Sequence, residues 1–350
     1  MRALSSIAPV VAHRRQLDRR SLAIGGGLVL ALSLAFGLAL LLGDYALAPE
    51  AVLRSLASPL TGVATPGADF IVLGVRLPRA LLALLSGAAF GLSGAIFQML
   101  LRNPLASPDI IGISSGASAA AVFCIIVLGW GGLALSLGAL GGALLTALAI
   151  YLLAWRDGLS PFRVVLVGIA VAAMLVAVIS YLFTRARIFE VQQAMGWLVG
   201  SLNGAAYGRI APLGLTMLVL VPLALLLGRA LALLPLGDDA AKGLGLAVEP
   251  VRVGLLAIAV ALCAFATAAV GPVSFVAFVA GPIARRLLGT GRVGLVPAAL
   301  VGALVMLVAD LVAQHGLPNT PLPVGVVTGL FGAGFLIWLL VDAGRAGRAA

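Results

Sequence analysis

Side chains that could carry out chemistry are few and widely spaced in this chain. Lys242 is the sole lysine, and the only histidines are His13 and His315. No glycine-rich loop precedes Lys242 and no Ser or Thr follows it, so the chain lacks a P-loop with which to bind and hydrolyse ATP. Neither histidine has a second ligand at metal-binding spacing, which indicates two solvated loop histidines and no metal site.

Three further reactive side chains lie within or beside apolar stretches. Cys124 and Cys263 are the only cysteines, and we expect them to be small buried residues, not a disulfide or a metal pair. Asp310 lies near the end of an apolar stretch, where an ionisable group either marks a functional site or anchors a helix end. No Ser-His-Asp set can be assembled on one side of these stretches, so we expect no enzyme.

The composition explains the scarcity of polar groups. Hydrophobic residues make up 62% of the 350 residues and charged residues 10%, with a mean hydropathy of +1.20. Soluble domains carry about 25% charged residues, so most of this surface cannot face water and lipid is its expected solvent. The net charge of +10 does not indicate nucleic-acid binding, because the basic residues lie between apolar stretches, as in the cytoplasmic loops of membrane proteins.

The apolar stretches predict an all-α, polytopic membrane protein. A spanning helix needs about 20 apolar residues. Ten candidates meet or approach this length: 22–43, 76–101, 109–129, 132–154, 162–183, 209–228, 251–270, 273–288, 295–312 and 321–341. The first is longer than the apolar core of a signal peptide, which is about 7–15 residues, so we expect it to be retained as a helix.

The basic residues predict how the chain lies in the membrane. If the N-terminus is cytoplasmic, sixteen of the 22 basic residues face the cytoplasm, as the positive-inside rule requires. The six on the outer side are Arg54, Arg76, Arg79, Arg185, Arg187 and Arg209. The resulting organisation is a basic cytoplasmic tail over 1–20, one transmembrane domain over 21–345 and a short cytoplasmic tail over 346–350.

Three connections are too polar or too interrupted to span a membrane: 44–70, 185–208 and 235–250. We expect a short surface helix in the first, at Pro49–Arg54. An amphipathic helix in the membrane interface is expected in the second, from the spacing of Ile188, Val191, Ala194 and Met195. Small residues four apart predict close helix contacts at two pairs, Gly87/Gly91 and Gly112/Gly116.

Five motifs, in order along the chain, carry a family resemblance. They are RLPRALLALLSGAAFGLSGAIFQMLLRNPLASPDIIGISSGA at 76–117, LGDDAAKGLGL at 236–246, GPVSFVAFVAGPIARRLLG at 271–289, ADLVAQ at 309–314 and LPVGVVTGLFGAGFLIWLL at 322–340. Across about residues 70–345 they resemble the FecCD family of binding-protein-dependent ABC importer permeases, which serve iron–siderophore, haem and vitamin B12 uptake. The resemblance implies the type II ABC importer permease fold, with ten helices per subunit.

The resemblance also implies partners and a location. A second permease subunit, either a copy of this chain or a paralogue, would complete the pore, and two separate ABC ATPase subunits would use ATP, so no cofactor is expected on this chain. A periplasmic or lipid-anchored binding protein would deliver the substrate. The expected location is the bacterial cytoplasmic (inner) membrane, with both termini cytoplasmic.

A ferric siderophore is the substrate we expect, with haem and cobalamin as alternatives. An ion-coupled secondary transporter is a more distant alternative. Such transporters tend to carry acids or broken helices at the membrane midplane, whereas the charges of this chain lie at span ends and in loops.

The resemblance assigns a docking role to the outer end of the second span. Arg76 and Arg79, three residues apart and therefore on one helix face, would pair with acids of the binding protein. The alternative is that they anchor the helix at the lipid headgroups. A third docking arginine of the family pattern is replaced here by Gln314.

Gate and coupling roles are implied on the inner side. The gate would comprise Asn103 and Leu105 after the second span, and Ser160, Pro161 and Phe162 before the fifth. The segment 237–246 would form the coupling helices that contact the ATPase. Its acidic residues suit the N-terminus of a helix, and its glycines suit the end of a helix. The candidate coupling residues are Gly237, Asp238, Asp239, Ala240, Lys242, Gly243, Leu244 and Gly245.

Overall fold

The computed structural model describes residues 7–63, 65–156, 158, 160–289, 294–317 and 320–346. Its regular elements in these ranges are helices. The N-terminal half contains α2 (Ile7–Leu41), α3 (Pro49–Thr61), α4 (Pro66–Asp69), the π-helical η1 (Phe70–Arg76), α5 (Leu77–Leu100), α6 (Ile113–Ile126), α7 (Gly132–Ala154) and α8 (Pro161–Arg185). The C-terminal half contains α9 (Ile188–Leu198), α10 (Tyr207–Leu226), α11 (Gly228–Leu233), the 3-10 turn η2 (Leu234–Leu236), α12 (Asp238–Gly243), α13 (Val248–Val270), α14 (Val276–Leu288), α15 (Leu295–His315) and α16 (Val324–Ala346).

Each of the ten predicted spans contains a helix, which confirms the all-α prediction. Seven helices of the described chain are long and apolar enough to cross a membrane. The second span was expected to start at 76 after a loop over 44–70, but helix continues without a break from Pro66 through α4 and η1 into α5. Two other predicted starts differ because of backbone angles. The third span begins at Ile113 and not at 109, because Gly112 takes a left-handed φ of 95°. The eighth begins at Val276, because Phe275 is also left-handed, with a φ of 69°, and α14 is therefore only 13 residues long.

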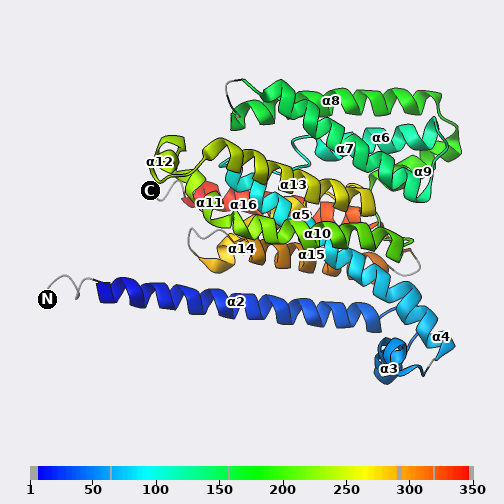
Figure 1. Ribbon diagram of the computed structural model, residues 1–350. Coiled ribbons are helices and arrows are strands. Elements are labelled where there is room, and N and C mark those ends of the chain that lie inside the picture. Colours follow the sequence, from blue (N-terminus) through cyan, green and yellow to red (C-terminus); the bar gives the residue numbers. More distant parts are fainter. Residues whose placement is uncertain are drawn as a thin grey trace.

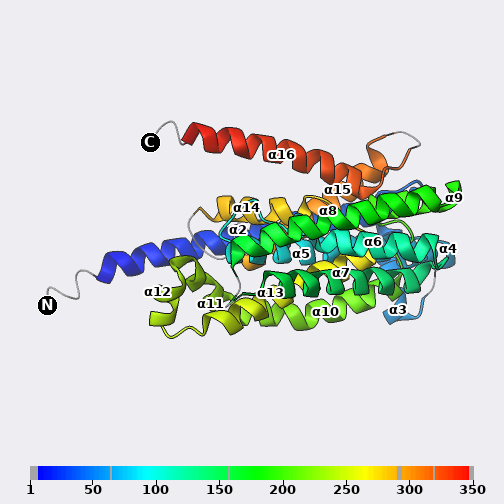
Figure 2. The same ribbon diagram turned by 90° about the horizontal axis from the view of Figure 1, so that it is seen from above.

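The long helices run roughly alongside one another between two ends of the molecule (Figures 1 and 2). The α12 end carries α12, the start of α2 and the end of α16. The opposite end, called the α9 end below, carries α3, α4 and α9 (Figures 1 and 2). Both ends of the described chain therefore lie on the same side as α12, as an even number of spans requires.

Helix α5 forms the centre of the bundle and is 83% buried over its most apolar window. Small residues allow its neighbours to approach. A Cβ added at Gly91 would lie 2.3 Å from the carbonyl oxygen of Ala298 in α15, and one at Gly87 would lie 2.5 Å from that of Gly302. Gly116 in α6 is equally close to Thr146 in α7. The predicted close helix contacts are confirmed at Gly87, Gly91 and Gly116. Gly112 lies before α6 with a left-handed φ, and a Cβ added there would lie 3.0 Å from the carbonyl oxygen of Gly168 in α8.

Three spans lie at the edge of the bundle. The most apolar windows of α2, α8 and α10 are each only 17% buried, and their outward faces are apolar, as with Met174 in α8 and Leu218 in α10, which are 70% and 73% exposed. In water such faces would be unfavourable. They fit helices that contact lipid or another subunit.

Two surface helices were expected in the α9-end connections, and both are present. Helix α3 begins at Pro49 as predicted but extends to Thr61. Helix α9 covers 188–198, but its predicted apolar face is largely unburied within this chain: Ala194 is buried, whereas Ile188 and Met195 are 81% and 48% exposed. Helix α2 extends back to Ile7, through the basic segment that the sequence suggested as a tail.

Candidate functional site

The segment around α12 is a short helix held between two glycine turns. Gly237 and Gly245 have φ angles of 107° and 84°, which side-chain-bearing residues rarely adopt. Asp238 and Asp239 occupy the first turn and Lys242 the last, the arrangement that the helix dipole favours. Ala241 is fully buried and fixes α12 to the bundle, while Leu236 and Leu244 are 61% and 63% exposed. The α12 end thus presents an apolar, charge-flanked rim to its surroundings.

An ion network fastens α12 to the bundle. Arg252 Nη2 in α13 donates to both carboxylate oxygens of Asp238, at 2.8 and 3.0 Å. Arg252 Nη1 also donates to Glu249 Oε1 at 2.5 Å. Arg102, just after α5, donates to the Leu234 carbonyl oxygen at 2.6 Å and to Asp238 Oδ1 at 3.3 Å. Asp238 therefore connects α12 to both α13 and the α5–α6 loop.

The charges around Asp238 keep it ionised. The hydrogen bonds from Arg252, then the positive charges of Arg252, Arg102 and Lys242, hold the pKa of this carboxyl below its usual value of 3.8. Partial burial opposes this effect without reversing it. At neutral pH Asp238 is therefore ionised.

A pocket of about 490 Å³ lies beside the network, lined by residues of α12, α13, the α5–α6 loop and the start of α8. Ser160 and Pro161 of the candidate gate line it together with Arg102 and Asp238. The structure thus brings one gate segment and the candidate coupling segment to the same pocket.

The other gate residues lie nearby but outside this pocket lining. Asn103 Oδ1 accepts a hydrogen bond from the Leu105 backbone at 2.9 Å, which forms a tight turn directly after Arg102. Leu105 is half-buried, and Phe162 at the start of α8 is 75% exposed. The apolar Phe162 side chain is therefore available to contact lipid or a neighbouring subunit.

Arg76, at the α9 end, is a buried residue. Its guanidinium donates to the carbonyl oxygens of Leu40 and Leu41, both at 2.9 Å, and to that of Tyr45. Only 8% of Arg76 is exposed. It caps the carboxyl end of α2, where free carbonyl groups need donors.

Arg79 has different partners. Its guanidinium donates to Asp310 in α15 through both Nε and Nη2, at 2.8–3.2 Å, and to Asn203 Oδ1 at 3.0 Å. Gln314 donates to the same aspartate at 2.8 Å. Asp310 is 2% exposed and Arg79 20%. Arg76 and Arg79 therefore have different surroundings, because Arg76 is buried against α2 whereas Arg79 pairs with Asp310. The docking role of the two arginines stays a prediction.

Several partners were absent from the sequence interpretation. Arg252 lies at the start of the predicted span 251–270 and Glu249 at the end of the connection before it, and nothing in their spacing indicates Asp238 as a partner. Asn203 lies after α9 outside any recognised motif, so the sequence did not indicate it as a partner of Arg79. Asp310 was identified as a candidate, and its partner Arg79 was identified separately. The pair joins positions 231 residues apart, which sequence spacing could not reveal.

The helical bundle, the apolar outward faces and the polar clusters at both ends define a multi-pass membrane protein. The chain belongs to the FecCD transport family, whose family model matches residues 30–342. It is 45% identical over 286 residues to the ferric enterobactin transport system permease protein FepG of Escherichia coli K12, covering 82% of this chain and 87% of that protein. It is 42% identical to the achromobactin transport system permease protein CbrC of Dickeya dadantii strain 3937, covering 85% of each.

A solved structure shares the fold. A metal-chelate type ABC transporter in an inward-facing conformation superposes with a TM-score of 0.81 and 27% identity, covering 91% of this chain and 99% of the other. The family resemblance in the sequence is thereby confirmed.

Proposed function

We propose that this chain is the transmembrane permease subunit of an ABC importer that takes up a ferric siderophore. The observation that carries the proposal is its 45% identity, over 82% of its length, to a permease named for ferric enterobactin. Relatives named for achromobactin and for iron(3+)-hydroxamate are 42% and 36% identical. Two of these names state an iron(3+) chelate and none states haem or cobalamin, which favours a ferric siderophore over those alternatives.

The energy would come from two separate ATPase subunits that seat on the α12 end. The exposed Leu236 and Leu244 offer apolar contact, and Lys242 and Asp239 offer flanking charge. A surface of this kind, with an apolar centre and a charged edge, is typical of protein interfaces. The candidate coupling residues of 237–246 would thus be the part of this chain that ATP-driven motion moves first.

Asp238 would transmit that motion in two directions. Its pair with Arg252 leads into α13, one of the two helices that pack most extensively on α5. Its contact with Arg102 leads to the turn of Asn103 and Leu105, and Ser160 lines the adjoining pocket. Movement of α12 would therefore shift both gate segments, including Pro161 and Phe162, with respect to the bundle.

The α9 end would receive the binding protein. Arg79 would be the docking cation, because part of its side chain is exposed. Gln314 would hold Asp310 so that Arg79 remains directed outward. Arg76 would support docking indirectly, by fixing the end of α2, since a direct contact would require it to leave three carbonyl groups.

In this proposal the chain lies in the bacterial inner membrane with the α12 end cytoplasmic and the α9 end periplasmic. The second permease subunit would cover the exposed apolar faces of edge helices such as α8. The orientation is tested by placing single cysteines at Ala240 and Gly204 and labelling them with a membrane-impermeant maleimide in intact cells. Labelling at 204 alone supports the proposal, whereas labelling at 240 alone reverses it.

A further inference from the structure

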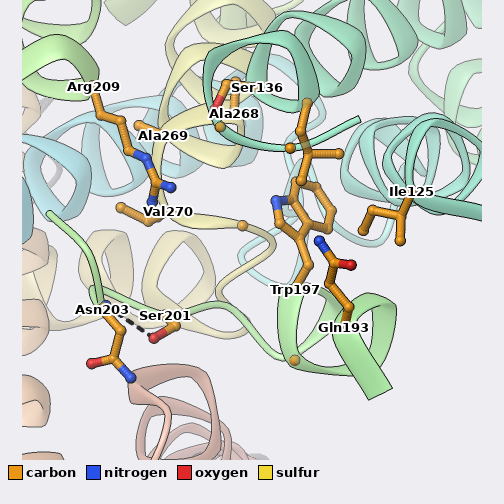
Figure 3. Close-up of a pocket in the computed structure, with 15 residues that line it drawn as sticks. Ile125, Ser136, Gln193, Trp197, Ser201, Asn203, Arg209, Ala268, Ala269 and Val270 are labelled. Atoms are coloured by element: carbon orange, nitrogen blue, oxygen red, sulfur yellow. Dashed lines mark hydrogen bonds between the residues drawn. The ribbon is translucent and has the colours of Figure 1, made fainter. Parts of the chain in front are cut away.

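A second pocket lies at the α9 end, away from the α12 network, and neither Arg79 nor Asp310 is among its described lining residues. It has a volume of about 370 Å³ and lies between α9, the α6–α7 turn and the ends of α13 and α10. Figure 3 shows Arg209 extending toward Ala269 and Val270, with Gln193 and Trp197 of α9 on the other side of the pocket. The lining combines one cation with hydroxyl, amide and indole donors.

Arg209 is the only charged residue in this lining. It is half-buried, and its guanidinium makes no hydrogen bond or ion pair within the described part of the chain. This distinguishes it from Arg76 and Arg79, whose guanidinium groups donate to carbonyl and carboxylate oxygens of this chain. A half-buried guanidinium without an anion favours an anionic ligand, and its planar donors suit phosphate.

An apolar groove continues from this pocket between α7, α10 and α13. Leu133, Leu137, Leu140, Pro212, Leu213 and Phe265 are among its lining residues. The groove and the polar pocket share four residues: Ser136, Arg209, Ala268 and Ala269. Arg209 therefore lies where a polar chamber meets an apolar one.

The groove opens toward lipid. Leu133 and Leu137 on α7 are 61% and 59% exposed, and they belong to a helix that is long and apolar enough to span. Trp130 and Tyr207, at the adjoining helix ends, are 43% and 51% exposed. Aromatic residues of this kind concentrate at the membrane–water interface. Their positions put Arg209 near the depth of the lipid headgroups.

We propose that this composite site binds one phospholipid, with its phosphate on Arg209 and an acyl chain along the groove between α7 and α10. The polar groups of Gln193, Ser201 and Trp197 surround the space that the headgroup would occupy. The groove itself has a volume of about 60 Å³, so it holds one segment of a chain and the remainder lies against exposed leucines. A soluble anion would leave this apolar half empty.

The test uses the full-length chain purified in detergent and three probes: dioleoylphosphatidylglycerol, dioleoylglycerol, and glycerol 3-phosphate. Binding is measured by native mass spectrometry and by the shift in thermal unfolding. We expect only the phospholipid to bind and stabilise. The R209Q variant should weaken its binding about tenfold, the loss expected for a hydrogen bond to a charged group, while R209K should retain part of it.

Two further variants separate the halves of the site. L137W fills the groove from an exposed position and should weaken phospholipid binding with Arg209 intact. R185Q removes an exposed arginine at the same end, stacked on Tyr181, and should leave binding unchanged. Equal phospholipid binding by wild type and R209Q would overturn the proposal. So would equal losses in R209Q and R185Q, or glycerol 3-phosphate binding as tightly as the phospholipid.

Discussion

Asp238 in α12 and Arg252 in α13 form a two-point ion pair, with Arg252 Nη2 at 2.8 and 3.0 Å from the two carboxylate oxygens. The pair joins the exposed segment at the α12 end to a helix that packs on the centre of the bundle. The guanidinium is 9% exposed and the carboxylate 43%, so one partner is anchored in the bundle and the other remains accessible from the surface.

Breaking this pair should uncouple transport from ATP hydrolysis. In D238N the Arg252 guanidinium loses one of its two charged partners and keeps Glu249. We expect this loss to cost about 1–2 kcal/mol after allowing for the exposure of Asp238. In proteoliposomes containing the complete transporter, substrate uptake per ATP hydrolysed should fall several-fold. D239N is the matched control, since Asp239 is exposed on the same helix, and it should resemble wild type.

A charge exchange sharpens this test. In the double variant D238R/R252D the pair is rebuilt in the opposite direction, and it should recover part of the coupling that each single variant loses. A double variant no better than the worse single variant would show that the pair itself does not carry the coupling.

Coupling should not depend on the ionisation of Asp238 between pH 6 and pH 8. The folded-state pKa of this carboxyl is lowered, so the pair contributes stability above the unfolded-state pKa. That contribution is lost only as pH falls through the lower folded-state pKa. The ratio of coupling in wild type to coupling in D238N should therefore be constant across this range. A ratio that changes strongly between pH 6 and pH 8 would contradict the assignment.

Replacing Asp310 should destabilise the protein and weaken docking. The carboxylate is 2% exposed and pairs with Arg79, and removal of one partner of a buried pair costs about 3 kcal/mol or more. D310N should lower the thermal unfolding temperature and the affinity for the binding protein. E50Q is the control: it breaks an exposed pair with Arg54, which contributes at most about 1 kcal/mol. Equal effects of the two substitutions would contradict the account.

The packing of α5 on α15 predicts a steric limit at Gly91. In G91A the new methyl would lie 2.3 Å from the Ala298 carbonyl oxygen, and forced repacking of this kind costs about 1–3 kcal/mol. We expect a lower unfolding temperature and less protein in the membrane. G27A serves as the control, because a Cβ at Gly27 has no neighbour within 4 Å. Normal stability of G91A would mean that the two helices are less closely packed than described.

The sequence predicted the helices better than the contacts between them. Long apolar stretches require helices in lipid, so each of the ten predicted spans contains a helix. The predicted starts were wrong where Gly112 and Phe275 take left-handed backbone angles, and where a helix begins before its apolar stretch, as at Ile7 and Pro66. Glycine spacing predicted the close packing at Gly91, because small residues four apart on a helix are enough to let another helix approach. Side-chain partners far apart in the chain, such as Asp238 with Arg252, depend on tertiary arrangement. The burial of Arg76 was missed for the same reason, since its partners are backbone carbonyl groups of α2.

The central claim is that this chain carries a ferric siderophore across the membrane. The most direct measurement is uptake of radioiron-labelled ferric siderophore by iron-limited cells that lack the gene, with and without a plasmid supplying the wild-type chain. The account predicts that uptake is lost in the deletion strain and restored by the plasmid, while haem and cobalamin uptake are unchanged. Undiminished siderophore uptake in a strain with no second ferric-siderophore permease, or a loss confined to haem or cobalamin, would contradict it.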